Sequence, residues 1–91
     1  MSDEQNLLIP STKILLSEVI KAINVLGGQA NARDIDSCVI ASLALSNETV
    51  NIPHGNDGSR TELKYRLAWA RTNAKKQGLI ERVGKGIWSV R

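Results

Sequence analysis

The chain has 91 residues, a net charge of +3, one cysteine and three aromatic residues. This length allows one domain, and 42% hydrophobic with 23% charged residues is typical of a globular fold. No apolar run approaches the roughly 18 residues of a membrane span. A single cysteine excludes an internal disulfide, which favours a reducing cytoplasm. So small a core leaves little room for a catalytic cavity, and we expect a binding module rather than an enzyme.

The charge is distributed unevenly along the chain. Residues 1–45 have a net charge of −2, whereas residues 46–91 have a net charge of +5. An acidic first half and a basic second half indicate that the second half faces a polyanion such as nucleic acid. The plainer interpretation is a solvated basic surface.

The first helix is predicted to begin at Ser11 or Thr12, either of which can cap it, and to end at Gly27-Gly28. We expect residues 1–9 to form a flexible tail. The apolar residues of this helix recur at helical spacing: Ile14, Leu15, Val19, Ile20, Ile23 and Leu26.

A second helix follows a short extended link at Gln29-Ala30, which we expect to add a third strand to the edge of a later hairpin. Asn31 caps this helix, with Asp34 near its positive end. Ser46-Asn47 closes it. Its inner face is predicted to consist of Ile35, Cys38, Val39 and Leu43.

Residues 47–59 contain asparagines, a proline and two glycines, which predicts an irregular loop with Ile52 as its anchor to the core. Ser59 or Thr61 then caps a third helix that runs to about Gln77 and ends at Gly78. A narrow apolar stripe follows this helix: Leu63, Leu67, Ala70 and Ala74.

Two short apolar runs, residues 79–83 and 86–90, flank the glycine-rich turn Gly84-Lys85-Gly86 and predict a β-hairpin. The order is therefore helix, link, helix, loop, helix and hairpin. We predict a single α+β domain over residues 1–91. Its expected fold is a winged helix-turn-helix, with three helices and a small antiparallel hairpin as the wing.

The third helix carries a basic face next to a face of hydroxyl and aromatic groups. Arginine can pair with guanine, while lysine and hydroxyl side chains can bind phosphates. This pattern therefore favours a recognition helix in the major groove of DNA. The basic hairpin would contact the adjacent backbone. A solvated amphipathic helix with a solubilising turn lysine is the alternative. The predicted DNA-binding residues are Arg60, Thr61, Lys64, Tyr65, Ala68, Arg71, Thr72, Lys75, Lys76, Arg82 and Lys85.

The two tryptophans have different predicted environments. Trp88 shares a strand face with Val90, which indicates the core. Trp69 lies off the apolar stripe of the third helix. We favour packing of Trp69 under the first helix or the loop, because an exposed tryptophan is unfavourable in a small domain. Its alternative is an exposed contact to a base or a partner.

Asp57 followed by Glu62-Leu63-Lys64 resembles the metal-binding pattern of many nucleases. In those enzymes the Glu-x-Lys element lies on a strand, so that alternate residues share a face. Here it falls in the first turn of a helix, which disfavours a nuclease. His54, interpreted as a loop residue, and Cys38 have no partners at metal-ligand spacing. We therefore expect no metal, no cofactor and no catalytic residue.

Three runs in the second half resemble the amino-terminal domain of Mrr-type restriction endonucleases over about residues 58–90. They are Arg66-Leu67-Ala68-Trp69-Ala70-Arg71-Thr72, Lys75-Lys76-Gln77-Gly78-Leu79-Ile80-Glu81 and Gly86-Ile87-Trp88. The resemblance implies a winged helix that binds double-stranded DNA, often at modified bases in foreign DNA, and delivers a separate nuclease domain. In this resemblance, the positions that match the family's motif are Arg66, Trp69, Arg71, Thr72, Lys75 and Lys76.

The chain departs from that family in the loop over residues 53–59, and these 91 residues contain no nuclease domain. We therefore expect either the target-reading module of a restriction system or a small stand-alone protein of the same type. Two other hypotheses stay open: a transcription regulator, which would usually dimerise on two half-sites, and a protein-interaction winged helix.

The expected partners are double-stranded DNA, methylated or plain, and a nuclease domain of the parent protein. We expect a cytoplasmic, nucleoid-associated monomer or weak dimer, with no membrane partner.

Overall fold

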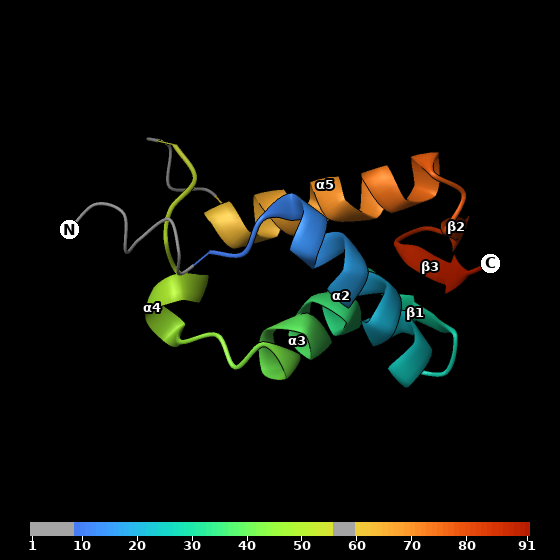
Figure 1. Ribbon diagram of the computed structural model, residues 1–91, viewed down its shortest axis with the longest axis horizontal. Helices are drawn as coiled ribbons and strands as arrows, with labels where there is room; N and C mark the ends of the chain where they lie inside the picture. Colours follow the sequence, from blue (N-terminus) through green and yellow to red (C-terminus); the bar gives the residue numbers. More distant parts are fainter. Residues whose placement is uncertain (1–8, 56–59) are drawn as a thin grey trace.

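The computed structural model describes residues 9–55 and 60–91, and within them there are four helices and a small three-stranded sheet, which lies at the opposite end of the molecule from α4 (Asn47–Val50) (Figure 1). This is the predicted α+β winged-helix architecture, with one helix more than expected. In chain order the elements are α2 (Thr12–Val25), β1 (Gln29–Asn31), α3 (Ala32–Ser42), α4 (Asn47–Val50), α5 (Glu62–Lys76), β2 (Ile80–Gly84) and β3 (Ile87–Val90).

The side-chain caps predicted from the sequence begin the three longer helices. The Ser11 hydroxyl accepts from the backbone N–H of Ile14 at the start of α2. Asn31 accepts from Asp34 over 2.8 Å at the start of α3. Each cap satisfies a backbone donor that has no partner inside its helix, which fixes where the helix begins.

The segment between α3 and α5 differs from the predicted loop. Ser46 caps a single helical turn, α4, and the side chain of Thr49 is buried there against the Ser46 hydroxyl at 3.1 Å. One turn with its own cap satisfies the backbone more fully than an irregular loop does. Ile52 is half-buried, but Val50 rather than Ile52 is among the side chains packed against the core. Ser59, the alternative cap of α5, lies outside the described residues.

The sheet has the strand order β1-β3-β2, and all its pairs are antiparallel. The link at Gln29 pairs with Ser89, which confirms the expected third strand. The hairpin turn is shorter than predicted, because Gly84 belongs to β2 and pairs with Ile87. The turn is therefore formed by Lys85 and Gly86 alone.

The core lies where α2 crosses α5 and α3, with the sheet closing one end (Figure 1). Ile9 is also buried, so it is not part of the predicted flexible tail; residues 1–8 lie outside the described part of the chain. Ile14 and Leu26, which belong to the apolar pattern of the first predicted helix, are exposed. The buried cluster consists of Leu15, Val19, Ala22, Ile23, Ile35, Val39, Leu63, Leu67, Ala70, Ala74 and Ile80.

Candidate nucleic-acid interface

The helix α5 buries its apolar stripe and turns the opposite side to solvent. The predicted stripe is completely buried, so with 3.6 residues per turn the outward side is fixed. Thr61 is the cap, since its hydroxyl accepts from the backbone N–H of Lys64 at 3.2 Å. The side opposite the stripe carries Thr61, Tyr65, Ala68, Thr72, Lys75 and Lys76.

Most of the predicted DNA-binding cations have no acidic partner in the described part of the chain. Within residues 9–55 and 60–91, no carboxylate forms an ion pair with Arg60, Lys64, Lys75, Lys76, Arg82 or Lys85. Unpaired cations beside hydroxyl groups form a surface suited to a phosphate backbone.

Arg71 differs from the other predicted cations, because it is tied to α3. Its guanidinium Nη1 lies 2.5 Å from Asp36 Oδ1, and the two side chains are only 13% and 15% exposed. Burial raises the pKa of Asp36, and the nearby charges of Arg71 and Lys64 oppose that rise. Arg71 therefore joins α5 to α3, and any contact to DNA would compete with this ion pair.

Helical spacing groups Arg60 with Lys64, Arg71 and Lys75, but the structure places it beside Tyr65 instead. It precedes the cap of α5, so its backbone is not helical and the helical wheel does not apply to it. Its guanidinium carbon lies 5.9 Å from the centroid of the Tyr65 ring. Arg60 therefore belongs with the aromatic side chains.

Three aromatic side chains form a row along one flank of α5. The His54 ring stacks on Tyr65, with centroids 3.9 Å apart and planes 15° from parallel. Tyr65 meets Trp69 nearly edge-on, at 6.5 Å and 71°. Trp69 is 45% exposed, so the prediction that it packs under α2 or the loop is wrong. Tyr65 and Lys76 flank its ring.

A hydrogen bond to Glu62 holds the side chain of His54 in this aromatic row, so His54 is not simply a solvated loop residue. Its Nδ1 donates to Oε1 of Glu62 over 2.7 Å, and Nε of Arg66 donates to Oε2 over 2.7 Å. The hydrogen bond from His54, with the Arg66 guanidinium, lowers the pKa of Glu62 although partial burial opposes this. Arg66 also donates to the carbonyls of Ile9 and Pro10.

This network has a consequence for the nuclease pattern in the sequence. Both carboxylate oxygens of Glu62 already accept hydrogen bonds from side chains. Asp57 lies outside the described residues. Across the described residues, no group of three histidine, cysteine, aspartate or glutamate side chains is placed to hold a metal ion.

Both aromatic side chains of α5 line a small hollow, which we call the aromatic pocket. Its volume is about 140 Å³. Thr72 donates its hydroxyl proton to the carbonyl of Ala68 at 3.0 Å, so that proton is not offered to the pocket. The aromatic pocket is lined by Arg60, Tyr65, Ala68, Trp69 and Thr72.

The wing is attached to the start of α3. The backbone N–H of Ala32 donates to the carbonyl of Gly86 over 2.9 Å, which holds the turn against that helix. Lys85 is exposed in this turn and lines a shallow pocket together with Arg33. Arg33 is not among the residues predicted from the sequence, although the first helix of a helix-turn-helix crosses the DNA backbone.

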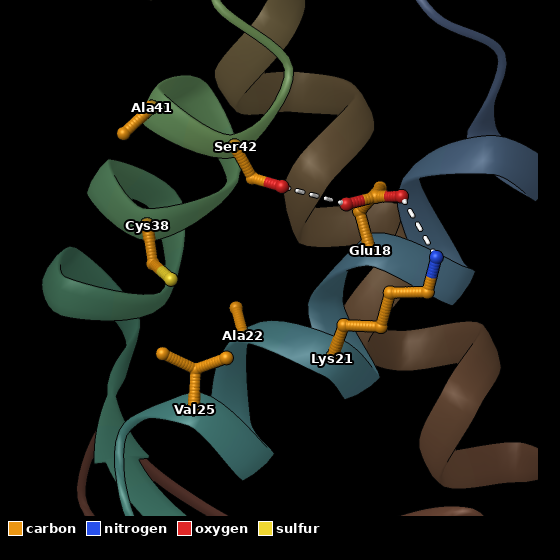
Figure 2. A pocket seen from close by; sticks show the side chains of 7 residues that line it. All are labelled: Glu18, Lys21, Ala22, Val25, Cys38, Ala41 and Ser42. Atoms are coloured by element: carbon orange, nitrogen blue, oxygen red, sulfur yellow. Dashed lines mark hydrogen bonds and ion pairs between the residues drawn. The ribbon is translucent and has the colours of Figure 1, made fainter.

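A separate groove of about 330 Å³ lies between α2 and α3, and Figure 2 shows the side chains that line it. Ala22, Val25 and Cys38 give it an apolar lining. Glu18 accepts hydrogen bonds from Ser42 and Lys21 at its rim (Figure 2). No residue of α5 lines this groove, so it is distinct from the candidate interface.

The structure divides the predicted site residues into three groups. The first surrounds the aromatic pocket and includes Lys76, whose ammonium lies 5.9 Å from the centroid of Trp69. Lys64 and Arg71 lie near Asp36, and Lys75 follows them toward the end of α5. Arg82 and Lys85 are on the hairpin.

The spacing of Tyr65, Ala68, Trp69 and Thr72 could have revealed the aromatic pocket from the sequence. Positions i, i+3, i+4 and i+7 share one helix face, and two small residues beside two large rings leave a hollow. The position of His54 could not be predicted in this way. It lies outside α5, and only the path of the loop places its ring against Tyr65.

Comparison with known proteins identifies a family for this chain. The profile of the Mrr N-terminal domain matches residues 3–90. The chain belongs to the Mrr N-terminal domain family. This membership confirms the resemblance seen in the sequence and makes the chain a restriction-system-associated domain. No curated protein and no solved structure matches it significantly. Among the described helices, none has the length and apolar character needed to cross a bilayer.

Proposed function

We propose that this Mrr N-terminal domain is a non-catalytic binder of double-stranded DNA and serves as the target-reading module of a restriction system. The observation that carries the proposal is the set of exposed lysines on α5: Lys64, Lys75 and Lys76 have no ion-pair partner among the described residues. Cations beside hydroxyl and aromatic groups on one helix are suited to the major groove.

In this proposal α5 enters the major groove and the wing contacts the neighbouring backbone. Lys85 and Arg82 of the hairpin would bind phosphates, together with Arg33 at the start of α3. Thr61, Tyr65 and Thr72 would face base edges. The nuclease chemistry would come from a separate domain, since Glu62 is held by His54 and Arg66.

A titration of one duplex at several salt concentrations tests the proposal. Neutralising about four to six phosphates would give a slope of log K against log salt of about −4 to −5. Lys85→Ala should lower the affinity and reduce the steepness of this slope by about 1. Lys13→Ala, an exposed lysine on α2, is the control and should change neither. A duplex affinity that is absent, or independent of salt, would contradict DNA binding.

We also propose, from the family membership, that the target is foreign or modified DNA. Competition between plain, adenine-methylated and cytosine-methylated duplexes of one sequence tests this. One modification should compete better than plain DNA, and equal competition by all of them would contradict it. Cytoplasmic, nucleoid-associated localisation would follow from such a target.

A further inference from the structure

The aromatic pocket has the size of a site for one flat ring. Its volume of about 140 Å³ corresponds to the liquid volume of about five water molecules. Tyr65 and Trp69 lie on successive turns of α5, and Ala68 and Thr72 are too small to fill the space beside them. A single ring system fits such a hollow, whereas a peptide helix or a base pair does not.

The rings that border the pocket are held in place by the fold. His54 covers one face of Tyr65 and is itself fixed by its hydrogen bond to Glu62. Tyr65 in turn meets the ring of Trp69 nearly edge-on. A pre-formed aromatic surface loses little conformational entropy when a ligand binds. Trp69 nevertheless remains 45% exposed, so part of its surface is open to a ligand.

The charges around the pocket favour a ligand that belongs to a polyanion. Arg60 lies beside Tyr65, and Lys76 lies beside Trp69. Among the described residues, none of those that line the pocket carries a carboxylate. A flat ring attached to a negatively charged backbone satisfies both the aromatic surface and the two cations. This combination is typical of sites that stack the bases of unpaired nucleic acid.

We propose that the aromatic pocket takes one unstacked nucleobase of a DNA strand, stacked on Trp69. The domain then prefers a duplex that contains an unpaired base over a fully paired one. A base inside a duplex must first leave its stack, which costs less for a base without a partner. This inference rests on the proposed DNA binding and adds a preference that major-groove contacts alone do not produce.

The test compares a fully paired duplex with the same duplex carrying one extra, unpaired thymine, at a single salt concentration. The 91-residue chain should bind the second duplex more tightly. Trp69→Ala should weaken binding of that duplex by about 5- to 150-fold, the range expected for one base–aromatic stack. Binding of the paired duplex should stay nearly unchanged. Trp69→Phe should keep most of the preference, since it retains an aromatic face.

Two further measurements control this experiment. Ile14→Ala removes a side chain of similar exposure, 51%, from α2 and should alter neither affinity. Quenching of tryptophan fluorescence by the unpaired base reports stacking directly. The Trp69→Phe variant, which keeps only Trp88, shows how much of the signal comes from Trp69.

The outcomes separate this inference from the proposed function. Equal wild-type affinity for both duplexes would overturn the inference and leave DNA binding intact. An equal loss for both duplexes in Trp69→Ala would overturn it as well, because Trp69 would then be a general contact. Unchanged affinities in Trp69→Ala would have the same consequence and point to a protein ligand for the pocket. No binding to either duplex would overturn the proposed function and the inference with it.

Discussion

At the scale of single residues, similar side chains on α5 perform different tasks. Arg66 and Arg71 match the family motif, yet both are engaged within the domain, with Glu62 and Asp36 respectively. Lys64 and Lys75 are exposed. Alanine substitution of the lysines therefore tests DNA binding more cleanly than substitution of the arginines does.

Removal of Arg71 should destabilise the domain. Arg71→Ala leaves Asp36 largely buried without its ion-pair partner, which should cost about 1–3 kcal/mol in the free energy of unfolding. Urea unfolding measures this cost. In the double variant Asp36→Ala/Arg71→Ala the loss should be smaller than the sum of the two single losses. Additive losses would show that the two side chains do not stabilise each other.

The lowered pKa of Glu62 predicts an acid-sensitive contribution to stability. A carboxyl whose native pKa lies below its unfolded-state value stabilises the fold above that unfolded-state pKa. The contribution is lost as the pH falls through the lowered native pKa. We expect the stability advantage of the wild type over Glu62→Gln to shrink over this interval in urea unfolding at a series of pH values.

The control for this pH experiment is Glu48→Gln. Glu48 is exposed in the first turn of α4, and it forms no ion pair with any of the described residues. Its substitution should leave the shape of the pH profile unchanged. Asp36 has a raised pKa and changes the stability in the opposite direction, since the cost of burying its charge is relieved as the pH falls.

A stability difference between wild type and Glu62→Gln that does not change with pH would refute the network of Glu62, His54 and Arg66.

At the scale of elements, the wing depends on the conformation of its turn. Gly86 has φ +69°, a left-handed conformation that side chains disfavour, and its carbonyl accepts from Ala32 at the start of α3. Gly86→Ala should therefore destabilise the domain by about 1–2 kcal/mol, although nothing lies within 4 Å of the added methyl.

Gly84→Ala is the matched control for the wing. Its added carbon would meet Ile87 at 3.6 Å, an ordinary contact, without a left-handed backbone. Thermal or urea unfolding should therefore show the smaller loss for Gly84→Ala. The opposite ranking would mean that crowding, rather than backbone strain, limits the hairpin.

At the scale of the whole molecule, one copy of the domain should bind one short site. With 15 residues, α5 is about 22 Å long, which is less than one turn of DNA at about 34 Å. We expect a single chain in solution and an affinity that is nearly constant for duplexes longer than about 10–12 base pairs. Sedimentation equilibrium and titrations with duplexes of graded length measure both quantities.

The alternative hypotheses give different results in these measurements. A stable dimer with a footprint of about two turns would favour the transcription regulator, because such proteins read paired half-sites. A protein-interaction module would show no salt-dependent duplex affinity at any length. The uneven charge, −2 in residues 1–45 and +5 in residues 46–91, favours both DNA-binding hypotheses over the protein-interaction module.

Much of the fold could be predicted from the sequence, because the decisive signals are local. The caps Ser11, Asn31 and Thr61, the apolar stripe of α5 and the terminating glycines each act over a few residues. The extra turn α4 was missed, since four residues give no periodic pattern. The hairpin turn was predicted one residue too long, because a glycine on either side of Lys85 is equally suited to a turn. The structure places Gly84 in β2.

The sequence by itself determined the order of the elements, the uneven charge and the basic, hydroxyl-bearing outward side of α5. Only the tertiary structure decided which cations are paired. It also placed His54 against Tyr65 and left Trp69 exposed at the aromatic pocket. The physical reason is distance along the chain. Helical periodicity is a property of neighbouring residues, whereas the Asp36–Arg71 ion pair and the His54–Tyr65 stack depend on how whole elements pack.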